Sequence, residues 1–512
     1  PVQFPAYLGQ LPPGNGVVFL SGTEMVGGLR AGSGATVSIQ PHPANPTAKL
    51  LVVTGAGEEQ LAQAARAIAL GHMGLAGTTV NVTKDVAAPA RKPGDAPAWV
   101  RTDRPMKLGE MARPEELRVQ GYFPEVVRVN YRVPPDVFTW RSEGVPLRLR
   151  YRATSVPAQR TSTVAIGVNN AFVHSIALND PNPKQAEEAG TGRPNPSVRT
   201  ASMFIPPYAV GGRDQLQVTF AFEMLREGIC QNVPPDNMLG AVDAESTIDF
   251  SGFPRYVALP NLSYFASIGF PFTRLADLSE TAIVLPDRPS ADEVALYLAV
   301  MGRMGESTGY PAVRHAVVTA GEVEKQPDRD LIVVGSGNNQ PLMARWAKQL
   351  PMVVDNGERR VRDMAYSWRP SYRWEQRDID DGPATLDPGM TLAGSGQLAA
   401  LMAFESPLKS ARSVVVLYAD RSTDLRKLSD ALLDTERVGL IRGDFAVVDD
   451  RNVSHTKVGA TYALGALPTV SKLRWFFSDQ PLLVALIALL ASVALATVLY
   501  RPLRRVWSRR KG

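Results

Sequence analysis

The chain has 512 residues, of which 45% are hydrophobic and 21% are charged. At about 150 residues per domain, this composition predicts three or four folded domains and excludes a disordered chain or a single small domain. The formal charge is +5, but six basic residues lie in the last twelve positions, so positions 1–500 hold 49 basic and 50 acidic residues. Because this bulk has no excess positive charge to neutralise phosphates, nucleic acid is excluded as a partner.

An α/β domain is predicted for residues 1–83. Strands are expected at 16–20 and 50–53, and the second strand leads into a Gly-x-Gly turn and an amphipathic helix. The sequence begins with proline rather than methionine, so we expect that a leader or a longer N-terminal part precedes it.

The middle of the chain has the pattern of an antiparallel sandwich. Residues 84–120 are rich in proline and charge and are predicted to be a linker. In 121–252 the hydrophobic period becomes two, most clearly where Leu147, Leu149 and Tyr151 alternate with arginines, which predicts one buried and one wet face. We expect a sandwich or jelly roll. Its predicted strands are 126–133, 147–152, 163–168, 172–178, 215–220 and 247–250, with a long loop at 179–199.

Residues 253–466 are predicted to form a second α/β domain. A strand at 281–285 precedes a helix at 290–304, with Ser290 as N-cap and Glu293 completing a capping box. A strand, a Gly-x-Gly turn and a helix then repeat the arrangement of the first domain. Alternating strands and helices predict parallel sheets with helices on their faces, so we expect both domains to be flavodoxin-like. Further strands are expected at 316–318, 331–334 and 413–417, and further helices at 397–404 and 423–433.

The C-terminal end predicts a membrane anchor. Residues 481–500 carry no charge, and twenty helical residues span about 30 Å, the thickness of a bilayer's hydrocarbon core. We therefore expect a transmembrane helix at 480–500. The basic tail at 501–512 includes Arg501, Arg504 and Arg505, which by the positive-inside rule places the tail in the cytoplasm and everything before the helix outside.

Residues 467–479 precede this span and are apolar and aromatic. Trp475, Phe476 and Phe477 lie here beside two basic residues. We predict an interfacial amphipathic helix on the outer leaflet, and an ordinary aromatic belt is the alternative.

The sequence contains no recognisable catalytic constellation. The Gly-x-Gly turns at 55–57 and 335–337 do not complete a G-x-G-x-x-G, and without a Gly-Lys pair there is no Walker A loop. Asp378 and Asp380 have the spacing of a glycosyltransferase metal site, but they lie in a charged loop that predicts solvated surface. The five histidines lack a second ligand at metal-binding spacing. We expect a chain that is not an enzyme and needs no metal or cofactor.

Aromatic rings are the remaining functional candidates, because sugars stack their C–H faces on tryptophan and tyrosine. Aromatics in sandwiches are more often core residues, so burial is the alternative. The candidates for carbohydrate binding are Tyr131, Trp140 and Tyr151 in the sandwich and Trp368, Tyr372 and Trp374 in the second α/β domain.

Several stretches, together with this order of parts, give the chain a family resemblance. They are FIPPYAVGGRDQLQVTF from Phe204, STIDFSGFPRY from Ser246, LIVVGSGNN from Leu331 and GSGQLAALMAFESPLKSARSVVVL from Gly394. The chain resembles the periplasmic B subunit of bacterial cellulose synthase. That family alternates two carbohydrate-binding jelly rolls with two flavodoxin-like domains, so the resemblance implies that a first jelly roll is missing upstream of Pro1. The lost part is a possible source of a disulfide partner for Cys230.

The resemblance implies a noncatalytic subunit of the bacterial inner membrane, with its bulk in the periplasm. Its implied partners are the multi-span catalytic cellulose synthase subunit, the extruded β-glucan chain and membrane lipid. Family members are often described as binding cyclic di-GMP. Arg369 and Arg373 match only half of the usual reader motif, so we expect this nucleotide on the catalytic partner. The alternatives are a membrane-tethered periplasmic polysaccharide-modifying enzyme and a single-span receptor.

Overall fold

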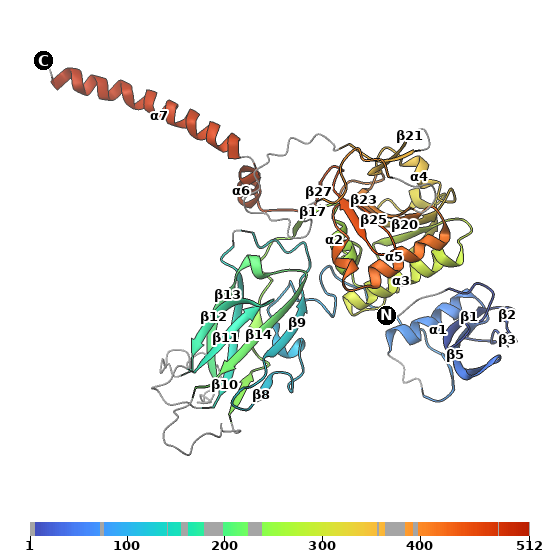
Figure 1. Ribbon diagram of the computed structural model, residues 1–512. Helices are drawn as coiled ribbons and strands as arrows, with labels where there is room; N and C mark the ends of the chain where they lie inside the picture. Colours follow the sequence, from blue (N-terminus) through green and yellow to red (C-terminus); the bar gives the residue numbers. More distant parts are fainter. Residues whose placement is uncertain are drawn as a thin grey trace.

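The computed structural model describes residues 6–71, 76–140, 142–154, 162–178, 198–223, 238–355, 358–363, 384–392, 398–479 and 481–510. Figure 1 shows three folded units in chain order: a small α/β unit, a β-sandwich and a larger α/β unit. A long helix projects from the C-terminal end of the third unit.

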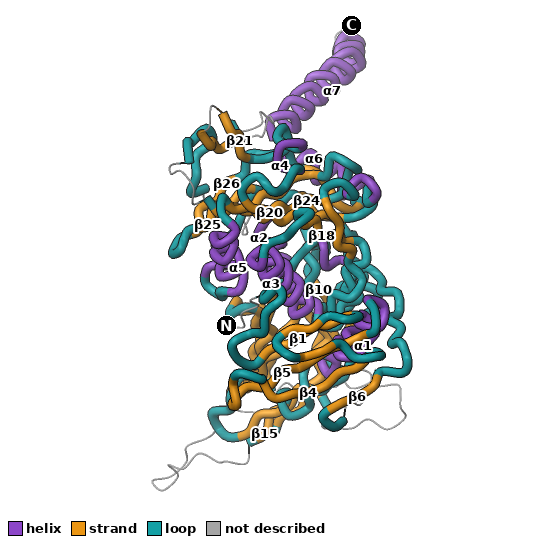
Figure 2. Tube along the Cα trace, turned by 90° about the vertical axis from the view of Figure 1, so that its right-hand side faces the viewer, coloured by secondary structure: helices purple, strands orange, loops and turns teal. Residues whose placement is uncertain are grey.

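The first unit is a small mixed sheet with a helix on one face, as Figures 1 and 2 show. Its elements are β1 (Gly16–Ser21), the β2 (Met25–Val26) and β3 (Leu29–Arg30) hairpin, β4 (Thr36–His42), β5 (Asn45–Gly55), α1 (Glu58–Leu70) and β6 (Thr79–Asn81). The sheet order is β1-β5-β4-β6, and only β1 and β5 are parallel. Val53 packs against Ala67 of α1 in the core. The two predicted strands and the helix are confirmed, whereas the expected parallel sheet is wrong for β4 and β6.

The second unit is a sandwich of two antiparallel sheets. Its strands are β7 (Met106–Lys107), β8 (Arg118–Gln120), β9 (Val127–Arg132), β10 (Val145–Ala153), β11 (Thr163–Val168), β12 (Ala171–Ala177), β13 (Arg199–Ile205), β14 (Arg213–Ala221), β15 (Leu239–Val242) and β16 (Thr247–Ile248). One sheet has the order β7-β16-β10-β15-β8 with β13 also on β10, and the other is β12-β11-β14-β9. Leu147, Leu149 and Tyr151 face the core, so the arginines between them lie on the outer face, as the alternation predicts.

The sandwich begins earlier in the chain than predicted. Strand β7 pairs with β16 and β8 pairs with β15, so residues 106–120 belong to the sheet rather than to a linker. Strands β13 and β15 were also not predicted. Strand β15 is short and contains Gly240, where an added Cβ would lie 2.6 Å from the Phe220 ring. The glycine that permits this close packing also removes the period-two signal.

The third unit is built on a seven-stranded mixed sheet. Its elements are α2 (Leu262–Ile268), β18 (Thr281–Leu285), α3 (Ala291–Thr308), β19 (Ala316–Thr319), β20 (Asp330–Ser336), α4 (Leu342–Arg345), β21 (Met352–Asp355), β22 (Glu358–Val361), β23 (Ala399–Glu405), β24 (Ser413–Ala419), α5 (Leu425–Leu433), β25 (Phe445–Val448) and β26 (Val453–Thr456). The order is β19-β18-β20-β24-β23-β25-β26, in which the first four strands are parallel and the other three pair antiparallel. Helices α2, α3 and α5 pack on one face, and Trp346 packs on the other.

Several predictions for this unit are confirmed and two are corrected. The Ser290–Glu293 capping box is present at the start of α3. The helix predicted at 397–404 is instead β23, which lies between β24 and β25 and exchanges its backbone hydrogen bonds with them. The amphipathic helix expected after β20 is reduced to the four residues of α4. A parallel, flavodoxin-like sheet therefore describes only four of the seven strands.

The chain enters and leaves the third unit on two paired strands, β17 (Tyr256–Leu259) and β27 (Tyr462–Gly465). Helices α6 (Thr469–Asp479) and α7 (Pro481–Arg510) follow β27 (Figure 1). Helices are thus present where 467–479 and 480–500 predict them, and α7 continues through most of the basic tail. Among the described residues, no helix combines the length and the apolar character needed to cross a membrane.

Candidate functional site

Two of the three aromatic candidates in the sandwich are core residues. Tyr131 and Tyr151 are 5% and 1% exposed and lie in the apolar cluster between the two sheets. Burial raises the pKa of the Tyr131 phenol, and the charge of Asp214 adds to that rise. A sugar cannot stack on a ring covered by the core, so the expectation that these two tyrosines line a glycan is wrong for this structure.

Trp140 is the partly exposed member of that set. Its ring lies 6.1 Å from Phe138, whose ring meets Tyr256 edge-on at 5.6 Å. Because Tyr256 begins β17, Trp140 lies near the junction between the sandwich and the third unit. Trp368, Tyr372 and Trp374 are outside the described residues, and their role in carbohydrate binding stays a prediction.

The predicted membrane-interface residues lie on the two C-terminal helices. Trp475, Phe476 and Phe477 belong to α6, and Arg501, Arg504 and Arg505 belong to α7. Apart from Phe477, which is half-buried, the structure describes only the backbone of these residues. Their contact with a membrane stays a prediction.

The Gly-x-Gly turn after β20 is filled by the chain's own side chains. Glu293, at the start of α3, is fully buried, and its Oε1 accepts hydrogen bonds from Ser336 Oγ at 2.8 Å and Asn339 Nδ2 at 2.6 Å. Its Oε2 accepts from the Ser290 backbone N–H at 2.7 Å. The carboxylate of Glu293 reaches this turn from α3 and occupies its hydrogen-bond donors with a negative charge, so the turn is unsuited to a nucleotide phosphate.

The corresponding turn after β5 is also unsuited to an anion. Glu58 and Glu59 lie in the first turn of α1, and their charges oppose a phosphate there. The Gln60 side chain accepts the Ala56 backbone N–H at 3.0 Å. Elsewhere in the described part of the chain, no three His, Cys, Asp or Glu side chains form a group that could hold a metal ion.

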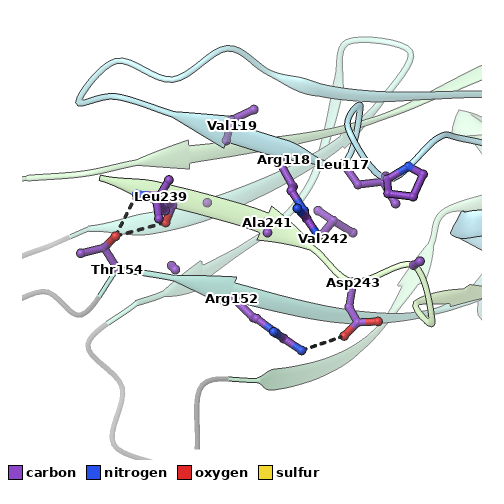
Figure 3. A pocket seen from close by; sticks show the side chains of 13 residues that line it. Leu117, Arg118, Val119, Arg152, Thr154, Leu239, Ala241, Val242 and Asp243 are labelled. Carbon is purple, nitrogen blue, oxygen red and sulfur yellow. Dashed lines mark hydrogen bonds and ion pairs between the residues drawn. The ribbon is translucent and has the colours of Figure 1, made fainter. Parts of the chain in front are cut away.

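A hollow of about 670 Å³ lies on the sandwich beside the edge strand β8 (Figure 3). We call it the β8–β15 hollow. Strands β8, β15 and β10 supply most of its lining. Its polar lining includes Arg118, Arg152, Thr154 and Asp243, and its apolar lining includes Leu117, Val119, Leu239 and Val242. This volume is in the range of small-ligand sites in proteins.

Three neighbouring strands place two arginines on either side of an alanine. Ala241 of β15 pairs with Arg118 of β8 on one side and with Arg152 of β10 on the other. Figure 3 shows both guanidinium groups reaching along the sheet from the strands that flank β15. Adjacent strands lie about 4.8 Å apart, so the two arginines start about 10 Å from each other across the small side chain of Ala241.

Backbone and hydroxyl contacts fix the acidic side of the hollow. The buried Ser246 hydroxyl accepts the Arg150 N–H at 2.9 Å and donates to the Arg150 carbonyl at 3.0 Å. The Asp243 N–H donates to the same carbonyl. Asp243 therefore lies at a fixed position, with one carboxylate oxygen 3.8 Å from Arg152 and 3.9 Å from Arg150.

The sequence carried part of the signal for this site. The alternation in β10 assigned Arg148, Arg150 and Arg152 to the solvent face but gave no reason to select one of them as a ligand contact. Arg118 lies in the stretch predicted as a linker, and β15 was not predicted. The register of β8, β15 and β10, which brings Arg118 and Arg152 to either side of Ala241, exists only in the folded sheet.

Comparison with known protein families identifies all three folded units. Residues 1–82 match the first FD domain of "Cellulose synthase BcsB", residues 105–247 match its second CBM domain, and residues 255–417 match its second FD domain. The CBM match contains the strands that form the β8–β15 hollow.

Curated relatives resemble nearly the whole chain. A "Cyclic di-GMP-binding protein" of Pseudomonas fluorescens is 36% identical over 99% of this chain and 68% of its own length, and a protein of the same name from Xanthomonas axonopodis is 36% identical over 98% and 65%. The chain thus spans about two thirds of these relatives. "Cellulose synthase 1" of Komagataeibacter xylinus is 31% identical over 93% of this chain and 31% of its own length. The chain belongs to the BcsB family of cellulose synthase subunits.

Proposed function

We propose that this chain is a noncatalytic accessory subunit of a bacterial cellulose synthase, anchored in the inner membrane with its folded units in the periplasm. The observation that carries the proposal is the succession of FD, CBM and FD domains of this family along one chain. The two Gly-x-Gly turns are occupied or acidic, which agrees with a role in which this chain holds no nucleotide.

The proposed partner is the multi-span catalytic subunit. The relative named "Cellulose synthase 1" contains a stretch similar to 93% of this chain within a protein about three times as long as that stretch. A covalent link keeps two parts of a protein at high local concentration, and where that link is absent a binding interface has to replace it. We assign that interface to α6 and α7.

The anchor is proposed from the sequence of α7, because the structure describes side chains in this helix only for residues 483–496 and 500. The stretch 481–500 has no charge and is long enough to cross about 30 Å of hydrocarbon. Arg501, Arg504 and Arg505 then lie on the cytoplasmic side, and α6 with Trp475, Phe476 and Phe477 lies on the outer leaflet.

In this arrangement the folded units meet the glucan after it leaves the synthase. Trp140 is the described aromatic candidate for contact with it, and Trp368, Tyr372 and Trp374 are further candidates. Relatives carry the name cyclic di-GMP-binding protein. We propose that in this complex the nucleotide binds the catalytic partner, because the proposed topology keeps the folded units away from the cytoplasm.

Deletion of residues 470–500 tests the proposal. Synthase activity is measured in membranes that contain the catalytic subunit and either the full chain or the deletion variant. We expect glucan output to fall to the level of membranes that lack this chain. A variant shortened only by residues 506–512 serves as control and should keep its activity. Unchanged output from the deletion variant would refute the role assigned to α6 and α7.

A further inference from the structure

The outer face of the six-stranded sheet has more positive than negative charge. Lys107, Arg118, Arg148, Arg150 and Arg152 occupy its strands, whereas Asp243 and Glu245 are the acids beside them. Glu245 already pairs with Lys107 at 2.7 Å. Among the described residues that line the β8–β15 hollow, Asp243 is therefore the one acid beside Arg118 and Arg152.

The two arginines that flank Ala241 keep donors available. The guanidinium of Arg118 makes no hydrogen bond or ion pair with any other residue that the structure describes, and its side chain lines the hollow. Arg152 approaches Asp243 at 3.8 Å, beyond hydrogen-bond distance, and its side chain is half exposed. Each planar guanidinium can bind a carboxylate through two parallel N–H groups.

The hollow also offers an apolar wall. Leu239 is 55% exposed although it lies in a strand, and it lies on the same face of β15 as Ala241. Thr154 fixes the end of β15, since its hydroxyl accepts the Leu239 N–H at 2.8 Å. The C–H face of a sugar ring fits such a wall beside charged groups that bind its polar substituents.

We propose that the β8–β15 hollow binds an acidic saccharide, with a sugar carboxylate between Arg118 and Arg152 and the ring against Leu239. The saccharide class rests on the proposed function, because the hollow lies in the part matched as a CBM domain. The preference for an acid rests on the excess of guanidinium groups. Asp243 and one arginine would be enough to bind the hydroxyls of a neutral sugar. The second arginine gives the hollow a net positive charge, which an acidic ligand neutralises.

Calorimetric titration of the full chain in mild detergent tests this site with two matched probes. Cellotetraose and its form oxidised to the carboxylate at every C6 share one backbone and differ in charge. The carboxylated probe should bind at least tenfold more tightly at low salt, and the difference should shrink as salt is raised. Equal affinity for the two probes would overturn the proposal.

Single substitutions test whether the carboxylated probe binds in the hollow. Arg118→Gln and Arg152→Gln should each weaken binding of the carboxylated probe about tenfold, the loss expected for one charge-assisted contact. Arg148→Gln is the matched control, since it removes the same charge from the same face outside the hollow. An equal loss in Arg148→Gln would mean that net charge alone binds the probe, and it would reject the site.

Filling the hollow tests it without a change of charge. Ala241→Leu should abolish binding of the carboxylated probe. If this variant has a lower melting temperature than the wild type, the smaller substitution Ala241→Val is used in its place. Binding that survives both substitutions would reject the hollow. If the hollow binds no saccharide but the chain still supports the catalytic subunit, the proposed function stands and only this site is rejected. Failure of the proposed function would instead appear as unchanged glucan output in the synthase membranes, which this titration does not measure.

Discussion

At the scale of single residues, Trp99 connects the segment before the sandwich to the third unit. Its side chain is 1% exposed, and its indole N–H donates to the Ser307 carbonyl of α3 at 2.8 Å. Trp99→Ala should lower the free energy of unfolding by about 3–5 kcal/mol, because it leaves a large cavity and removes one of the two side-chain hydrogen bonds that the Ser307 carbonyl accepts. Urea denaturation followed by circular dichroism measures this change. Phe123→Ala, which removes a ring that is 84% exposed, should change stability by less than about 0.5 kcal/mol.

Glu110 makes the stability of the sandwich depend on pH in the acid range. Arg104 donates two hydrogen bonds to its carboxylate, at 2.9 and 2.7 Å, and the Lys107 N–H donates a third. These contacts lower the pKa of Glu110 from 4.5 to about 2. A lowered pKa in the folded state stabilises the fold above pH 4.5, and this contribution is lost as pH falls toward 2.

The expected size of this effect is below about 1 kcal/mol, because the pair is partly exposed and water screens it. Glu110→Gln should flatten the dependence of the urea midpoint on pH between 4.5 and 2. Arg104→Gln should flatten it to a similar degree, and the double variant should add little more. A Glu110→Gln profile that runs parallel to the wild-type profile would contradict the assignment.

The residue scale also shows what the sequence can and cannot specify. Its period-two pattern placed Tyr151 on the same face as Leu147 and Leu149, and that face is buried. A sugar-stacking role for Tyr151 therefore conflicted with the pattern itself. The sequence could not predict that Arg118 and Arg152 lie on either side of Ala241, because this depends on which strands become neighbours. Contacts between distant parts of the chain decide that.

At the scale of elements, β23 shows why helix propensity alone gave a wrong prediction for residues 397–404. Its sequence, AALMAFE, is rich in residues with high helix propensity, and all but its last residue are buried. In the centre of the sheet it contributes apolar side chains to both faces, which an amphipathic surface helix cannot do. The backbone pairing of β23 with β24 and β25 therefore outweighs its helix propensity, which amounts to a few tenths of a kcal/mol per residue.

Helix α3 allows the value of a capping box to be separated from that of a buried network. Ser290→Ala should cost about 1 kcal/mol, the usual loss for a helix N-cap. Glu293→Ala should cost about 2–4 kcal/mol, because it also leaves the buried Ser336 hydroxyl and the Asn339 amide without this acceptor. Urea midpoints of the two variants measure the difference. Equal losses would mean that the network at the turn contributes nothing beyond the cap.

At the scale of the whole molecule, three successive units and a C-terminal helix pair could be predicted from changes in hydrophobic period. The mixed sheets could not, because strand direction depends on how connections cross a sheet and not on the strand's own residues. The antiparallel β17–β27 pair was likewise unforeseen. It joins segments about 200 residues apart and brings the start of the third unit next to the helices that follow it.

This pair determines how the C-terminal helices attach to the folded units. Tyr462 in β27 lies with its hydroxyl 2.5 Å from Ser413 Oγ of β24, and β17 continues directly from the sandwich. On the sandwich side, Arg132 donates to the Ser307 carbonyl and pairs with Glu306 at 2.6 Å. The sandwich and the large sheet therefore meet at the junction from which the chain continues into α6.

If α7 only holds the chain at a membrane, any apolar helix of the same length will replace it; if it also binds the catalytic subunit, its side chains matter. Replacing residues 481–500 by a Leu/Ala helix of equal length should keep the chain in the membrane fraction but reduce co-purification with the catalytic subunit at least tenfold. Membrane flotation and pull-down measure the two properties on the same sample. Full co-purification by the substituted helix would assign partner binding to α6 and the folded units, and it would leave α7 as an anchor alone.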